Sequence, residues 1–252
     1  MTQIDFSAIV KQYRSPGVVA VVLMGSHARG DAGPFSDVDI VRFCDSDPQH
    51  APTETHLIDT HFVVISTVGP SRVSDWFSKP EEATASIAGI RAARPLWDPD
   101  AHFERIQNRA VAFQWDAAMQ DKANAYASAE MVGLIEEAQK GLEGLRRHDI
   151  GRLLNARYGL SWGLTNVMRV QRGILISGDN ASYAEVLTDI GAESEWAEAS
   201  RRVFGLTGLC LSDQVRAGLQ LYRVTARLLD DILHERDRPL VREVLRRING
   251  EI

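Results

Sequence analysis

The hydrophobic pattern of the chain changes near residue 100, and this change restricts the possible folds more than any other feature. Before it, apolar residues form short runs bounded by glycine, proline and serine, which is typical of strands. These runs are 18–24, 38–44, 55–58, 61–68 and 93–97. After it, apolar residues recur at helical spacing over 102–115, 122–147, 150–173, 183–204 and 212–236. We therefore predict an α+β protein, in which a small mixed β-sheet domain (1–110) precedes a C-terminal helical bundle (111–252).

The charge balance bears on the kind of partner. Asp and Glu number 34 against 28 Lys and Arg, and the basic residues form no run. This disfavours an extended nucleic acid and favours a small or cationic acceptor. No stretch of about 18 apolar residues suggests a membrane span, and the N-terminus lacks a signal-peptide pattern, so we expect a cytoplasmic protein. Cys44 and Cys210 lack metal-site spacing, and we expect both to be buried.

The residues that indicate chemistry lie between the first two predicted strands. Gly25 and Ser26 follow the first strand, and Ser36-Asp37-Val38-Asp39 opens the second. Alternation along a strand places Asp37 and Asp39 on one face, where their charges repel unless a cation lies between them. Carboxylate oxygens suit Mg²⁺, and a glycine lets backbone amides approach phosphate oxygens closely. The segment predicts a site for Mg²⁺ and a nucleoside triphosphate.

This segment resembles the signature of the nucleotidyltransferase superfamily that includes DNA polymerase beta. The resemblance implies that Mg²⁺ ions hold the triphosphate while an acceptor hydroxyl attacks the α-phosphorus and pyrophosphate leaves. The short form Gly-Ser-x-x-Arg-Gly and the helical second half resemble antibiotic nucleotidyltransferases of the kanamycin and lincosamide types. That implies transfer of AMP from ATP to a small-molecule hydroxyl, with Arg29 and Ser36 at the nucleotide and Asp37 and Asp39 as catalytic metal ligands.

Members of the superfamily usually carry a third carboxylate on a neighbouring strand. The predicted strand 61–66 contains no acid. Asp59 has the parity of His61 and Val63 and is our candidate third metal ligand, although aspartate at that position also suits a hairpin turn. Glu54 is a more distant alternative.

A candidate general base lies in the helical half. Glu136 and Lys140 stand four residues apart and share a helix face. The resemblance to kanamycin nucleotidyltransferase implies that Glu136 is the base and that Lys140 contacts phosphate, with Glu137 as the alternative if the register differs by one. A solvent-exposed ion pair without function explains the spacing equally well.

Three further residues are candidates for ligand binding. Tyr158 and Trp162 stand four apart on a predicted helix, and we expect them in the core rather than under a nucleobase. Asp179 follows Gly178, where it could face a cationic acceptor or cap a helix.

Two other functions remain open on the sequence. One is a protein-adenylylating enzyme like the small antitoxins of this superfamily, although these contain little more than the α/β domain. The other is a regulatory module that binds nucleotide without chemistry, which the missing strand carboxylate favours. The residues do not decide the acceptor, ATP against GTP, or monomer against homodimer.

Overall fold

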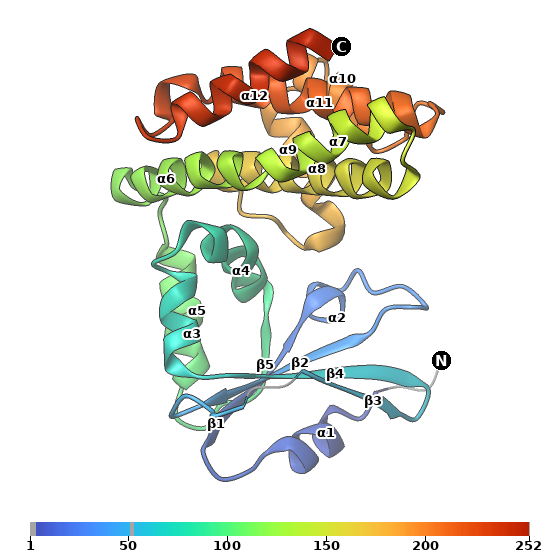
Figure 1. Ribbon diagram of the computed structural model, residues 1–252. Helices are drawn as coiled ribbons and strands as arrows, with labels where there is room; N and C mark the ends of the chain where they lie inside the picture. The colour runs from blue at the N-terminus through green and yellow to red at the C-terminus, as the bar shows by residue number, and fades with distance from the viewer. Residues whose placement is uncertain (1–3, 51–52, 252) are drawn as a thin grey trace. The chain divides into compact units, whose positions relative to one another are not determined.

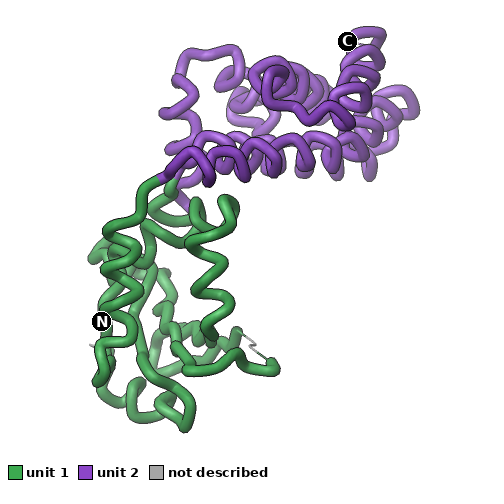
Figure 2. Tube along the Cα trace, turned by 90° about the vertical axis from the view of Figure 1, so that its left-hand side faces the viewer, with its two compact units in different colours: residues 1–114, 175–179 green, residues 115–174, 180–252 purple. Residues whose placement is uncertain are grey.

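The chain divides into two compact units in a computed structural model that describes residues 4–50 and 53–251. One unit comprises Met1–Gln114 and Leu175–Asp179, and the other Trp115–Ile174 and Asn180–Ile252 (Figure 2). The first contains a five-stranded sheet and the second is helical, so the predicted α+β class is confirmed. The short segment Leu175–Asp179 returns from the helical region to the sheet unit.

The sheet of the first unit is mixed. Its strands lie in the order β3-β4-β2-β1-β5, with β2 and β4 parallel and the other neighbours antiparallel. The predicted apolar runs correspond to these strands, which are β1 (Val18–Met24), β2 (Val38–Cys44), β3 (Glu54–Ile58), β4 (His61–Val68) and β5 (Arg94–Trp97). β3 is therefore an edge strand, and β2 lies between β1 and β4.

Helices cover the two faces of the sheet differently (Figure 1). Helix α1 (Phe6–Tyr13) packs its Ile9 and Tyr13 on alternate strand residues such as Ile40 and Ile65, and we call this side the α1 face. The opposite side, the α4 face, is covered by α3 (Pro70–Trp76), α4 (Pro80–Ala92) and α5 (His102–Ala112). There the Phe43 ring packs 6.1 Å from Trp76 and 5.2 Å from Phe103.

The second unit is a helical bundle around a core that includes Trp196 and Tyr222. The Tyr222 hydroxyl donates a hydrogen bond of 2.9 Å to the Met131 carbonyl, which satisfies a polar group in that core. Its helices are α6 (Ala117–Gly133), α7 (Ile135–Arg147), α8 (Ile150–Gln171), α9 (Asp179–Ile190), α10 (Glu195–Val203), α11 (Leu211–Leu228), the 3₁₀ helix η1 (Asp230–Ile232) and α12 (Arg238–Glu251). None of the helices described is both long and apolar enough to cross a membrane.

Two long segments predicted as single helices are each divided. Segment 122–147 breaks at Leu134, whose φ of −78° and ψ of −2° leave the chain close to helical, so the apolar spacing continues through the break. Segment 183–204 breaks at Gly191, which adopts a φ of +103°.

Four residues that we expected to be buried are not. Cys210 is exposed and its thiol donates to Asp213, while Cys44 is only half-buried. Tyr158 and Trp162 are also exposed, because the buried side of α8 is formed by Leu153, Ala156, Leu160 and Leu164. The Trp162 ring instead packs edge-on against Phe204, with ring centroids 4.9 Å apart.

Candidate functional site

The backbone at Gly25 lies directly against the side chain of Asp39. β1 ends at Met24, which pairs with Asp39 across the ladder, and the chain turns at Gly25 with a φ of +65°. A Cβ atom at Gly25 would lie 2.0 Å from Oδ2 of Asp39, so any side chain there would require the carboxylate to shift. The next residues form the short helix α2 (Gly25–Arg29), and Ser26 is its second residue.

Electrostatic conditions at Asp39 favour a bound cation. The carboxyl is half-buried, and burial, followed by the negative charge of Asp37, raises its pKa above the ordinary value. His27 and Arg29 oppose this shift with positive charge. His27 therefore also contributes to the site, and its Nε2 atom is buried without a hydrogen-bond partner among the described residues.

The donor set of the pair fits Mg²⁺. Among residues 4–50 and 53–251, no group of three or more His, Cys, Asp or Glu side chains could hold a metal ion. Magnesium, however, is commonly held by one or two carboxylates together with substrate phosphates. Asp37 and Asp39 supply the carboxylates, and the backbone amides at Gly25 and Ser26 begin a helix beside them. The residues present suit a magnesium ion that binds with its nucleotide.

Ser36 shapes the loop before the carboxylates. Its hydroxyl accepts a hydrogen bond of 2.9 Å from the Gly33 amide, and its own amide donates to the Gly33 carbonyl at 3.1 Å. These bonds close a turn that leads into Asp37. In the structure, Ser36 thus orients the loop, and its predicted contact with nucleotide remains a proposal.

Arg29 connects α2 to the returning segment Leu175–Asp179 of the same unit. Its Nη1 atom donates to the Ser177 carbonyl at 3.2 Å, and its Nε atom lies 3.2 Å from the Asp31 carboxylate. The segment is also held by the Ile176 amide, which donates to the Thr84 carbonyl at 3.0 Å. Arg29 is therefore fixed beside the carboxylate pair.

The returning segment brings another acid toward the site. The charge of Asp179 contributes to the raised pKa of Asp39, behind burial and Asp37. Asp179 could face a cationic acceptor or cap a helix on sequence grounds, and no local signal shows that this distant segment joins the sheet unit. Only the tertiary fold reveals this residue.

The parity argument for Asp59 is wrong. β2 and β4 pair in parallel, with Val38 opposite Val63 and Asp39 opposite Val64. Residues with the parity of Val63 therefore lie on the α1 face, across the sheet from Asp39. Asp59 itself has a φ of +53° in the turn between β3 and β4, the role that its local hydrogen-bonding chemistry suits. We leave it out of the proposed metal site.

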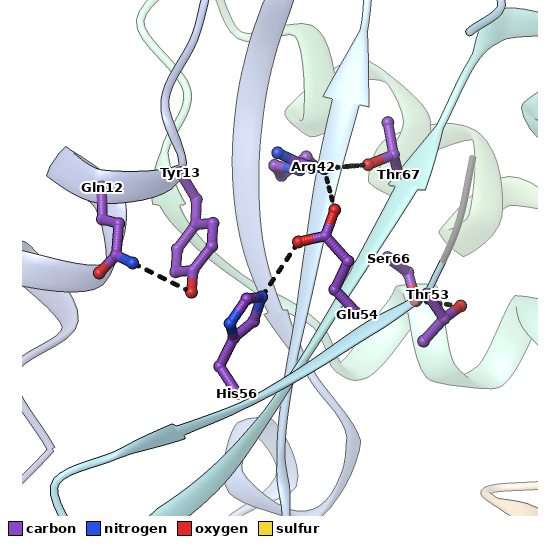
Figure 3. A network of polar contacts seen from close by, with 8 residues as sticks. All are labelled: Gln12, Tyr13, Arg42, Thr53, Glu54, His56, Ser66 and Thr67. Atoms are coloured by element: carbon purple, nitrogen blue, oxygen red, sulfur yellow. Dashed lines mark hydrogen bonds and ion pairs between the residues drawn. The ribbon is translucent and has the colours of Figure 1, made fainter. Parts of the chain in front are cut away.

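Glu54 also belongs to the α1 face. It pairs with Ile65 across the β3–β4 ladder and joins a polar network that links three strands (Figure 3). Its carboxylate lies 3.0 Å from Nε2 of His56 and 3.9 Å from Nη2 of Arg42, and Arg42 in turn donates to the Thr67 hydroxyl at 2.7 Å. Glu54 therefore holds the edge strand and does not face Asp39.

The candidate base lies in the second unit, on α7. Lys140 Nζ lies 2.9 Å from Glu136 and 2.8 Å from Glu137, and these two contacts raise the pKa of Lys140. The Glu136 side chain is 74% exposed and that of Glu137 is 21% exposed. Oε2 of Glu137 is buried without a partner among the described residues. The structure shows the ion pair, and the role of base for Glu136 remains a proposal.

Comparison with known proteins finds one family match within the first unit. Residues 5–85, which include Gly25, Arg29, Asp37 and Asp39, match a family model described as the nucleotidyltransferase domain. Eleven chains of solved structures also match. One is a nucleotidyltransferase-like protein from Exiguobacterium sibiricum 255-15, with a TM-score of 0.51 and 11% identity over 89% of this chain and 73% of that chain.

The family match and the structural match support different conclusions. At 11% identity the structural likeness shows the fold alone. A search of curated proteins finds no significant match. The match of residues 5–85 to the nucleotidyltransferase domain supports the predicted nucleotidyl transfer, while the resemblance to antibiotic-modifying members stays a prediction.

Proposed function

We propose that the protein transfers AMP from ATP, with Mg²⁺, to a hydroxyl group of a small molecule, for example an aminoglycoside or lincosamide antibiotic. Nucleotidyl transfer follows from the domain, whereas the donor, the metal and the acceptor are our proposal. One observation carries it, the contact of the Gly25 backbone with the Asp39 carboxylate. Phosphate-binding amides and a cation-binding carboxylate are thereby built into one point of the fold.

The residues of the sheet unit have distinct tasks in this proposal. The amides at Gly25 and Ser26, with the Ser26 hydroxyl, bind phosphate oxygens, and Arg29 offsets their charge. Asp37 and Asp39 would hold Mg²⁺, which supplies charge compensation for the triphosphate and for the departing pyrophosphate. This arrangement aligns the α-phosphorus for attack.

The transfer exchanges one phosphorus–oxygen bond for another. The acceptor oxygen bonds to the α-phosphorus, the bond to the bridging oxygen breaks, and pyrophosphate leaves with that electron pair. We assign the acceptor proton to the Glu136 carboxylate and charge compensation at the phosphates to Lys140. Both assignments rest on the resemblance to kanamycin nucleotidyltransferase.

The test separates binding from turnover. Calorimetric titration of ATP with and without Mg²⁺ measures the first, and pyrophosphate release across a panel of aminoglycosides and lincosamides measures the second. We expect Mg²⁺-dependent binding of ATP, and acceptor-dependent release that Asp37→Asn and Asp39→Asn abolish. If both variants bind and turn over like the wild type, the proposed site is wrong.

A second candidate is nucleotide binding without chemistry. It is favoured by β4, whose residues on the side of Asp39 are Phe62, Val64, Ser66 and Val68, none of them acidic. Mg²⁺-dependent binding of ATP without pyrophosphate release from any acceptor would favour it. Label from ATP appearing only on protein would instead indicate a protein-modifying enzyme.

A further inference from the structure

The sheet order defines the side from which an acceptor reaches the site, provided that the proposed function holds. In phosphoryl transfer the attacking and leaving oxygens lie roughly in line. The phosphate-binding residues Gly25–Arg29 follow β1, on one side of β2 and its carboxylates. The acceptor must then approach from the other side of β2, over β4 and β3.

Two large apolar side chains are exposed on that side. Leu57 and Phe62 are direct partners in the β3–β4 ladder and are 67% and 62% exposed. Phe62 stands two residues from Val64, the partner of Asp39, so it shares the α4 face and lies about 7 Å along the strand from Val64. Next to this pair, Thr55 lies opposite Val64.

We propose that Thr55, Leu57, Phe62 and Val64, here called the platform, form the acceptor subsite and pack against an apolar part of the acceptor. Exposed aromatic and aliphatic side chains beside a reaction centre gain free energy when an apolar ligand surface covers them. The platform carries no charge, so it gives a polycationic acceptor no partner at this place. The acceptor is a molecule whose hydroxyl adjoins an alkyl, aromatic or sugar C–H surface.

The uncharged platform restricts the chemical class of the proposed acceptor. A lincosamide carries both a sugar and an alkyl chain, whereas an aminoglycoside carries several ammonium groups. The platform favours a lincosamide over an aminoglycoside. It also accounts for β4 without an acid, since the strand that usually supplies a third carboxylate here supplies an apolar contact surface.

The experiment measures the affinity of lincomycin and of kanamycin by calorimetry, with and without Mg²⁺ and a non-hydrolysable ATP analogue. Phe62→Ala and Leu57→Ala remove the platform side chains. Val111→Ala removes another exposed apolar side chain of the same unit, on α5, and serves as the matched control. Because all three positions are exposed, we expect the variants to fold, which thermal unfolding checks.

We expect Phe62→Ala to weaken lincomycin binding about tenfold and Leu57→Ala to weaken it about threefold, while Val111→Ala has no effect. The affinity for the ATP analogue should stay unchanged in all three variants. Kanamycin should bind more weakly than lincomycin, and the platform variants should leave its affinity unchanged.

Several results would overturn the subsite. An affinity for lincomycin that is unchanged in both variants, or no binding of lincomycin at millimolar concentration, would overturn it. Weaker binding of the ATP analogue in Phe62→Ala would assign the platform to the nucleobase. A shift from dimer to monomer in light scattering would assign it to a second copy of the chain. Failure of the proposed function is distinct, because the wild type would then release no pyrophosphate from ATP with any acceptor of the panel, whatever its affinity for lincomycin.

Discussion

Gly25 is the residue whose backbone lies directly against the candidate metal ligand Asp39. Its φ of +65° strains any L residue, and the 2.0 Å separation between a hypothetical Cβ and Asp39 Oδ2 would force that carboxylate to move. We predict that Gly25→Ala displaces the Asp39 carboxylate and lowers nucleotidyl transfer about a hundredfold or more, because small misplacements of a reacting geometry have large effects.

Gly30 provides the matched control for this substitution. It also has a positive φ, of +84°, but a Cβ there would meet no atom within 4 Å. Gly30→Ala should therefore cost only the backbone strain of about 1–2 kcal/mol in unfolding free energy and leave ATP binding intact. Equal losses of ATP affinity in the two variants would show that strain, and not contact with Asp39, explains the effect.

Asp39 predicts an unusual dependence of stability on pH. Its pKa in the folded state is raised above the ordinary value of 3.8, first by burial and then by Asp37. A carboxyl whose pKa is higher in the folded state than in the unfolded state stabilises the fold fully only below its unfolded-state pKa. This contribution is lost as the pH rises through the folded-state pKa. In metal-free protein, Asp39→Asn should therefore raise the melting temperature at pH 7 and leave it unchanged near pH 3.

Thermal unfolding in a metal chelator measures this effect. Asp31→Asn is the control, because that carboxylate is exposed and its ion pair with Arg29 contributes little. Addition of Mg²⁺ and ATP should reverse the order and stabilise the wild type more than Asp39→Asn. A lower melting temperature for Asp39→Asn at pH 7 without metal would contradict the raised pKa.

At the scale of elements, the sequence predicts strands better than their pairing. Runs of apolar residues bounded by turn formers locate β1, β2 and β4 at their observed limits, because runs rich in β-branched and apolar residues are a strong local signal. The parallel pairing of β2 with β4 has no local signal. The face assigned to Asp59 depended on that pairing, and the register with Asp39 opposite Val64 reversed it.

The same limit applies to the helical half. The apolar spacing predicts helices but not the break at Leu134, since that residue stays close to helical geometry and carries no turn signal. Nor does it predict that Leu175–Asp179 joins the sheet unit, because the bonds of Arg29 to Ser177 and of Ile176 to Thr84 connect residues far apart in the sequence. The sequence therefore predicts the part of the candidate site that lies in the motif. It does not predict the part that the distant segment Leu175–Asp179 contributes.

Arg29 allows the returning segment to be tested as an element. We predict that Arg29→Ala raises the KM for ATP about tenfold, because a charge-assisted phosphate contact is lost. Amide exchange at Ile176–Asp179 should also become faster, since the bond to the Ser177 carbonyl no longer anchors the segment. Hydrogen-exchange mass spectrometry and steady-state kinetics measure the two effects.

Arg29→Lys separates the two roles of the arginine, which are the phosphate contact and the anchoring of the returning segment. Arg29→Lys keeps the charge but not the planar group that reaches both Ser177 and Asp31. It should restore part of the affinity for ATP while exchange of the segment remains fast. Unchanged exchange in Arg29→Ala would show that the bond of Ile176 to Thr84 holds the segment without help from the arginine.

At the scale of the whole molecule, the two units carry different parts of the proposed chemistry. The nucleotidyltransferase family match covers residues 5–85, within the sheet unit, and this unit contains the carboxylate pair. The candidate base and Lys140 belong to the helical unit, outside that match. Substitutions of the carboxylate pair should therefore affect nucleotide binding, whereas replacement of the candidate base should affect turnover.

Glu136 and Glu137 make this division testable with closely matched variants. Each contacts Lys140, at 2.9 Å and 2.8 Å, so Glu136→Gln and Glu137→Gln remove one similar contact each. If Glu136 is the base, its replacement should lower kcat by about 10² to 10⁴ and leave the affinity for ATP with Mg²⁺ unchanged. Glu137→Gln should keep kcat within a few fold, and Asp37→Asn should abolish the binding that both glutamine variants retain. The reverse order of the two kcat values would place the base at Glu137, and unchanged kcat in both would remove the base from α7.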